Sequence, residues 1–183
     1  MTFYAFLGVL SAVITGLAVV KVLQGILWMI HGRGQIKVYW VHLVWVGFTI
    51  FGAFLHYWNI GNLRNNMSGE SWRGVADMLL VPIFSYLIAG LLFPPSGKDR
   101  PVDLRDFYYE NHAWIFGAFA IMIVTSAGHL DAIINHTFEL NTILGPYVLV
   151  LMFAALAVIR NKWYHMVNAI ILPFVIILSL LLN

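Results

Sequence analysis

The sequence contains no cysteine, and only 10% of its 183 residues are charged. The missing cysteine excludes disulfides, thiolate metal sites and cysteine nucleophiles. The scarcity of charge argues against a soluble domain, which carries about 25% charged residues. There is no phosphate-binding loop, nucleophile elbow or HExxH motif, so no soluble enzyme is predicted. There is also no block of basic residues and the net charge is only +2, so no nucleic-acid partner is predicted.

The low share of charged residues is accompanied by a high share of apolar residues. They make up 61% of the chain, and the mean hydropathy is +0.85. A helix that crosses the hydrocarbon core of a bilayer needs about 20 apolar residues. Six runs meet this need, at residues 3–30, 38–60, 72–93, 107–130, 142–159 and 163–182. We therefore expect an all-α fold, with residues 1–183 forming one integral membrane domain, a polytopic bundle of about six transmembrane helices.

The distribution of lysine and arginine predicts how this bundle is oriented. The loops after the first, third and fifth runs carry seven of these residues: Arg33, Lys37, Lys98, Arg100, Arg105, Arg160 and Lys162. The other connections carry only Arg64, after the second run, and Arg73, at the start of the third run. Positive charge stays on the cytoplasmic side, so both termini are expected on the outer side of a cell (inner) membrane. The lipid bilayer is then the main partner of the protein.

Three polar residues inside the predicted spans are candidates for a functional site, because polar groups at membrane depth are costly. Lys21 is the deepest charge, and it is expected either to pair with an acid or bind an anion, or to extend its long side chain to the inner interface. Asp77 lies one turn inside the outer boundary, where water can solvate it. Tyr86 lies near the middle of the third run and is expected to be buried.

The histidines suggest a cofactor. His42 and His56 are 14 residues apart, which is almost four helical turns, so both lie on one face about 21 Å apart. This spacing resembles that of paired haem ligands in the b-type cytochromes of respiratory complexes. His112 and His129 lie at the same two levels of the fourth run. Haem b between the two helices is therefore one interpretation, although the 17-residue spacing turns His129 about 100° away from His112.

Two further patterns concern packing and the cytoplasmic turns. Small residues at four-residue spacing predict close helix contacts on the first and fourth runs: Gly8, Ala12 and Gly16, then Ala113 and Gly117. Each inward turn places a basic residue and a tyrosine before a histidine, at Lys37, Tyr39 and His42, at Arg105, Tyr109 and His112, and at Lys162, Tyr164 and His165. The repeat predicts either three histidines gathered as a metal or proton site, or only the usual interfacial anchors.

Two segments carry a resemblance to known proteins. The first is His31-Gly-Arg-Gly34 with the stretch from Lys37 to Trp45, and the second is Leu91-Leu-Phe-Pro94 with Asp103-Leu-Arg-Asp-Phe-Tyr-Tyr109. Together they resemble a group of small bacterial multi-pass inner-membrane proteins for which no activity is established. The resemblance implies the location and topology given above, and it transfers no function to any residue.

Three functions fit these observations. The first is a small transporter or channel, which would use the polar groups near each face. The second is a b-type haem-binding electron-transfer subunit, which would use His42, His56, His112 and His129. The third is a non-catalytic accessory subunit of a larger membrane complex, or a homo-oligomer, because the fifth and sixth runs are almost free of charge and suit contact with lipid or protein equally.

Overall fold

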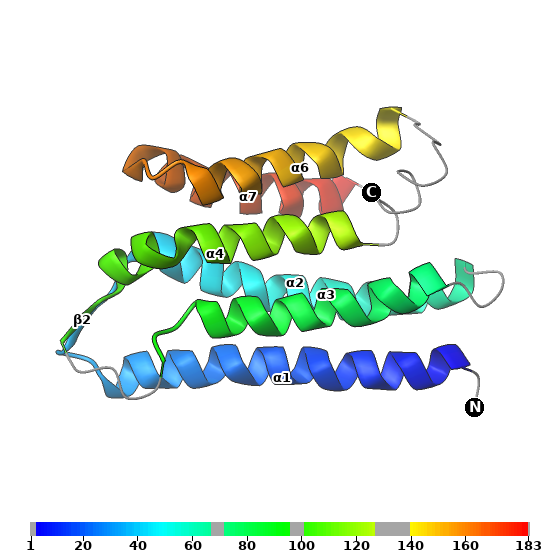
Figure 1. Cartoon of the computed structure of the whole chain (residues 1–183), viewed down its shortest axis with the longest axis horizontal. Helices are drawn as coiled ribbons and strands as arrows, with labels where there is room; N and C mark the ends of the chain where they lie inside the picture. The colour runs from blue at the N-terminus through cyan, green and yellow to red at the C-terminus, as the bar shows by residue number, and fades with distance from the viewer. Residues whose placement is uncertain (1–2, 67–71, 96–100, 127–139, 183) are drawn as a thin grey trace.

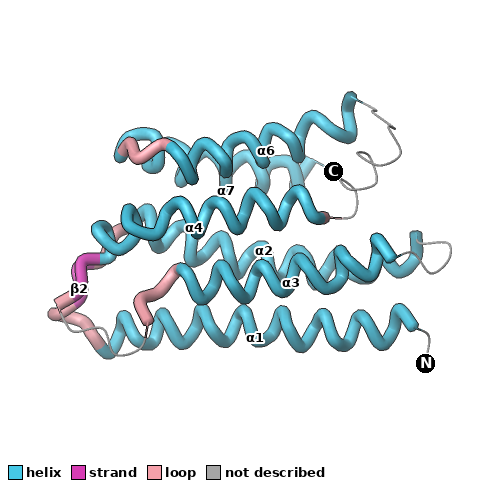
Figure 2. The backbone as a smooth tube through the Cα atoms, in the orientation of Figure 1, coloured by secondary structure: helices cyan, strands magenta, loops and turns pink. Residues whose placement is uncertain are grey.

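A computed structural model describes residues 3–66, 72–95, 101–126 and 140–182. Within these ranges the chain forms six helices: α1 (Phe3–His31), α2 (Trp40–Asn66), α3 (Trp72–Leu91), α4 (Leu104–Thr125), α6 (Leu140–Val158) and α7 (Lys162–Leu182). Figure 2 shows that helix accounts for nearly all of the described backbone. The predicted all-α class is confirmed.

Two helices are long and apolar enough to cross a membrane, judged by length and composition. They cover Ala5–His31 and Trp40–Trp58. Shorter apolar helical stretches lie at Met78–Leu91, Tyr147–Val158 and Lys162–Ile177 among the residues described. The 29 residues of α1 span about 43 Å, more than the hydrocarbon core of about 30 Å.

The helices lie side by side and run alternately in opposite directions (Figure 1). The most extensive contacts join α1 with α3, α3 with α4, and α4 with α6. The ends of α1, α3 and α6 and the starts of α2, α4 and α7 lie at one end of the bundle, and both termini lie at the other (Figure 1). Up-and-down topology of this kind is usual for helices joined by short connections.

A small sheet ties two of the connections together. Strands β1 (Ile36–Lys37) and β2 (Val102–Asp103) pair in parallel, and the N–H of Val102 donates to the carbonyl of Gln35 over 2.9 Å. The turn before β1 passes through Gly34 at φ 93°, a left-handed conformation that favours glycine. Because the sheet joins distant segments, it fixes the start of α4 relative to the end of α1.

Two helix boundaries differ clearly from the predicted spans. The fourth run was expected to begin at residue 107, but α4 begins at Leu104, because the Asp103 carboxylate accepts from the N–H of Arg105 over 2.9 Å and caps the helix. The second run was expected to end at residue 60, but α2 continues to Asn66. Residues 127–130 of the fourth run lie outside the described ranges.

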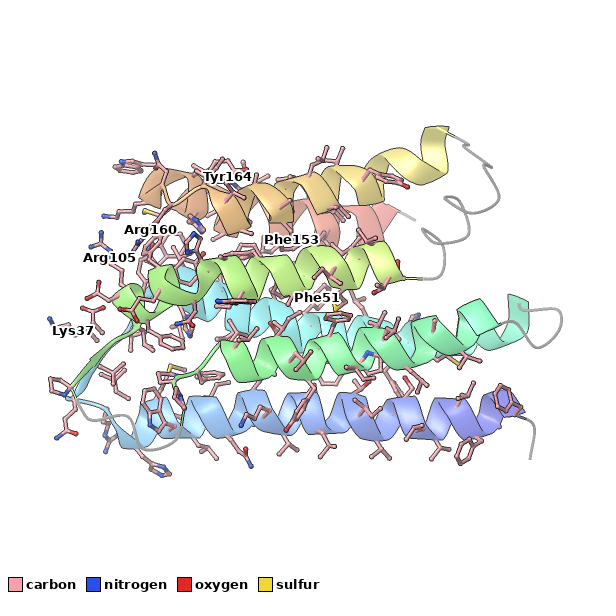
Figure 3. All side chains as sticks on the ribbon, in the orientation of Figure 1. Lys37, Phe51, Arg105, Phe153, Arg160 and Tyr164 are labelled. Atoms are coloured by element: carbon pink, nitrogen blue, oxygen red, sulfur yellow. The ribbon has the colours of Figure 1, made fainter. Side chains whose placement is uncertain are left out.

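Aromatic rings form the core between α2, α4 and α6. The ring centroid of Trp45 lies 4.9 Å from that of Phe116 and 5.9 Å from that of Phe153. Phe119 and Phe153 stack at 5.0 Å, and Figure 3 shows Phe153 on the inner side of its helix, toward the middle of the bundle. The predicted small-residue contacts are wrong at Gly16 and Gly117, where an added Cβ would meet nothing within 4 Å in the described chain.

Candidate functional site

A cleft opens between α1, α3 and α4 near the end that carries the sheet. Its volume is about 390 Å³, within the range of small-molecule sites. Its polar side chains are Lys21, Gln24 and Asn111. Its other walls are largely apolar and are made by Gly25, Trp28, Gly90, Leu91, Phe93, Pro94, Pro95 and Phe107.

Lys21 extends from α1 across the cleft toward α3. A Cβ added at Gly90 would lie 4.0 Å from Cε of Lys21, so the lysine stem passes beside this glycine and a larger residue there would meet it. Lys21 is partly buried, and it makes no ion pair with any residue that the structure describes. The prediction of an acidic partner is therefore not met in the described chain, and the ammonium is directed at the cleft.

The cleft owes its shape to Gly25 and Phe93. A Cβ at Gly25 would overlap the Phe93 ring, so only glycine lets this ring lie against α1. Phe93 also contacts His42 edge to face, with the ring centroids 5.9 Å apart. On α4, Nδ2 of Asn111 donates to the carbonyl of Phe107 over 2.9 Å, which orients the amide. The structure identifies Asn111 and Phe93 as site residues that the sequence analysis missed, because their roles depend on how three helices are rotated.

His42 lies behind this cleft and is fully buried. Neither of its ring nitrogens has a hydrogen-bond partner among the described residues. The rings of Phe93, Phe107 and Tyr108 surround it, with centroids 5.9, 6.5 and 6.2 Å away. A buried polar group without a partner costs about 1–3 kcal/mol and calls for an explanation.

The other two histidines of the predicted repeat, His112 and His165, belong to a hydrogen-bonded cluster that does not include His42. Nε2 of His165 lies 2.8 Å from the carbonyl of Ile159, so this nitrogen carries a proton and donates. Nδ1 of a neutral His165 therefore accepts from the Tyr108 hydroxyl, 2.7 Å away. Nδ1 of His112 likewise donates to the carbonyl of Tyr109 over 2.7 Å.

The rings of His112 and His165 are 5.5 Å apart, so the structure brings these two together and leaves His42 among its aromatic neighbours. A hydroxyl pair, Tyr39 and Tyr109, lies at 3.2 Å in the same cluster. In the part of the chain that the structure describes, no three histidine, aspartate or glutamate side chains are placed to hold a metal ion. The gathering of all three histidines is therefore not observed.

The positions of the histidines support the haem interpretation on α2 and oppose it on α4. His42 and His56 are both buried on α2, as it requires, and Nε2 of His56 lies 3.2 Å from the Ser11 hydroxyl on α1. The ring of His112, however, packs against His165, and three aromatic rings occupy the surroundings of His42. A haem at His42 would have to displace those rings. His129 lies outside the described residues, and the haem interpretation stays a prediction.

The remaining candidates do not join the cleft. Tyr86, expected to be buried, is 42% exposed, because it follows Ser85, whose hydroxyl takes the inward position and donates to the carbonyl of Val81 over 2.9 Å. Asp77 lies on α3, and its side chain is outside the described set.

Two other hollows are chemically distinct from the cleft. A cavity of about 170 Å³ between α2, α3, α4, α6 and α7 is lined by apolar side chains with Thr49 and Ser85. A shallow recess of about 360 Å³ beside the turn between α6 and α7 mixes both signs of charge, with Arg105, Asp106, Glu110, Arg160 and Lys162. Of these three hollows in the described chain, only the cleft has a single charged side chain, Lys21, between apolar walls.

No protein-family model, no curated protein and no solved structure matches this chain. The assignment of function therefore depends on the geometry of the cleft and on the surroundings that the exposed side chains require.

Proposed function

We propose that the chain is a multi-pass protein of the bacterial inner membrane with six spans and both termini outside. The membrane location is supported by the distribution of side chains, which is the reverse of that in a soluble protein. Large apolar side chains are exposed along the helices, among them Phe6, Leu17, Leu27, Trp114, Leu151, Ile170 and Phe174. Polar side chains such as Ser11, Thr15, His42, Thr49 and His165 are buried. Soluble monomers rarely expose apolar surface on this scale, whereas lipid favours it.

The placement of basic residues supports the proposed orientation. Lys37, Arg105 and Arg160 lie at the end of the bundle that holds the sheet (Figure 3). Both termini lie at the opposite end (Figure 1). The positive-inside rule then assigns the sheet end to the cytoplasm.

Within this membrane protein, the proposed activity is transport of a small solute. The observation that carries the proposal is the cleft with Lys21, a cation without an ion-pair partner in the described chain. Lys21 lies ten residues before the end of α1, about 15 Å along the axis, and therefore within membrane depth. An ionisable group at that depth is a functional candidate by default, because a purely structural helix gains nothing from it.

Topology is tested first, and the absence of cysteine makes the test clean. Gln35→Cys places one thiol at the sheet end, and Asn65→Cys places one at the far end of α2. A membrane-impermeant maleimide added to intact spheroplasts should label the second variant and spare the first until the membrane is opened. Labelling of Gln35→Cys from outside would contradict the orientation.

Transport is then tested in proteoliposomes. Vesicles with the wild-type chain or with Lys21→Met are placed in potassium chloride, acetate or benzoate with valinomycin, and swelling is followed by light scattering. The wild-type chain should accelerate swelling in at least one salt, and Lys21→Met should remove the acceleration. Wild-type rates equal to those of empty vesicles in all three salts would contradict transport.

A second candidate, a b-type haem subunit, is favoured by one observation: both nitrogens of the buried His42 lack partners in the described chain. Imidazole is a common axial ligand of haem iron. The purified protein, produced with added haem precursor, should then show a Soret band that His42→Ala abolishes. A spectrum without that band eliminates this candidate.

A further inference from the structure

The charge of the cleft indicates the sign of its ligand. Among the residues that the structure describes, Lys21 is the only charged side chain that lines the cleft. Asp103, Asp106 and Glu110, acidic residues of the described chain, lie elsewhere, the first beside Lys37 and the other two at the charged recess. A cation between apolar helices is stabilised by an anion, since attraction grows as water is excluded.

The neutral polar groups suit a compact anionic group. Gln24 and Asn111 face the same cleft from α1 and α4. The Asn111 amide donates one N–H to the carbonyl of Phe107 and makes no other hydrogen bond within the described residues. Its second N–H is therefore available to donate to a ligand. One ammonium and two amides match the oxygens of a single carboxylate or phosphate group.

The remaining walls suit an apolar body attached to that anion. Trp28, Phe93 and Phe107 present aromatic surface, and Leu91 adds an aliphatic side chain. A volume of about 390 Å³ exceeds what one inorganic ion needs and is close to that of sites for small organic molecules. Apolar walls of this extent would remain poorly hydrated around a bare inorganic anion.

We propose that the cleft between α1, α3 and α4 binds an organic anion, with its single anionic group at Lys21 and its apolar body against Trp28, Phe93 and Phe107. The inference rests on the proposed transport function, because it names the class of solute. A membrane lipid and a free organic acid share this chemistry, and they are distinguished by experiment.

Binding is measured directly, without a transport step. The full chain is placed in phosphatidylcholine nanodiscs, and radiolabelled benzoate is titrated at equilibrium. Saturable binding is expected, with benzylamine and inorganic phosphate failing to compete, because the first has the wrong charge and the second has no apolar body. Lys21→Met should weaken binding at least tenfold, whereas Lys37→Met, which removes an exposed lysine at the same end, should leave it unchanged.

A second variant tests the volume without removing the charge. Gly90→Leu directs a side chain at the stem of Lys21 and fills the cleft, so it should also weaken binding at least tenfold. Equal binding of benzoate and benzylamine, or full binding by Lys21→Met, overturns the proposal. Nanodiscs containing phosphatidylglycerol identify the source of the anion. Loss of benzoate binding there assigns the site to the headgroup of a lipid with net negative charge, and unchanged binding assigns it to a free acid.

Failure of the two proposals can be separated. Benzoate binding that depends on Lys21, in a protein whose vesicles never swell faster than empty ones, upholds the anion site and rejects transport. Faster swelling in potassium chloride alone, without saturable benzoate binding, upholds transport and rejects the organic anion as its solute.

Discussion

The side of the bundle formed by α2, α4, α6 and α7 is built differently from the side where α1 meets α3. On the first side, Trp45, Phe116 and Phe153 interlock, and His165 uses both ring nitrogens in hydrogen bonds. On the second side, α1 and α3 pack closely along their length, but a cleft opens beside them at the sheet end, and Lys21 has no ion-pair partner in the described chain. Dense packing stabilises a fold, whereas an open cleft with apolar walls and a few polar groups permits binding.

Removing a ring from the packed side should give the largest effect. Phe116 is fully buried, and its ring is 4.9 Å from that of Trp45. Phe116→Ala leaves a cavity, so the free energy of unfolding should fall by about 3–5 kcal/mol. Phe54→Ala is the matched control, because Phe54 is 63% exposed on α2. Unfolding by sodium dodecyl sulfate from bicelles measures both variants, and equal losses would show that burial in the aromatic core does not decide the cost of removing a ring.

Breaking the hydrogen bond between Tyr108 and His165 should have a smaller effect. Tyr108→Phe keeps the ring and leaves Nδ1 of His165 buried without a donor, which costs about 1–3 kcal/mol. Tyr57→Phe removes a hydroxyl from an exposed ring and should cost almost nothing. The same unfolding measurement applies, and a Tyr108→Phe protein as stable as the wild type would show that this bond does not support the packed side.

The sequence predicted the number and approximate extent of the described helices better than their contacts. Apolar runs and turn residues determine where a membrane helix starts and stops, and the Asp103 cap explains why α4 begins three residues early. The rotation of each helix about its axis decides which side chains meet. With apolar residues around most of the circumference, the sequence gives little preference for one rotation.

The residues of the candidate site were also predictable only where they depend on a single helix. Lys21 was predicted from its depth alone, a property of one helix. The contacts of Asn111 and Phe93 with the cleft, and the pairing of His112 with His165 rather than His42, depend on three or more helices together. The close approach at Gly25 was missed for the same reason, whereas the predicted contact at Gly16 is open space.

Removing the charge on the cleft side should change stability in the opposite direction from the changes on the packed side. Lys21→Met loses no ion pair of the described chain and removes a cation from the apolar candidate span Ala5–His31, so the unliganded protein should gain about 1 kcal/mol. Lys21→Gln, which keeps a polar group there, should gain less. A loss of stability in Lys21→Met would mean that the ammonium is held by a structural partner, and the contrast between the two sides would weaken.

The smallest effect is expected at the sheet, which belongs to neither side. Lys37 and Asp103 approach to 3.8 Å, and the lysine side chain is 83% exposed. Solvent screens such a pair, so Lys37→Met should cost no more than about 0.5 kcal/mol. Asp103→Ala also removes the cap of α4 and should cost about 1 kcal/mol, whereas Asp103→Asn keeps a capping oxygen and should match Lys37→Met. If Lys37→Met, Asp103→Ala and Asp103→Asn all lost the same stability, the ion pair rather than the cap would fix the start of α4.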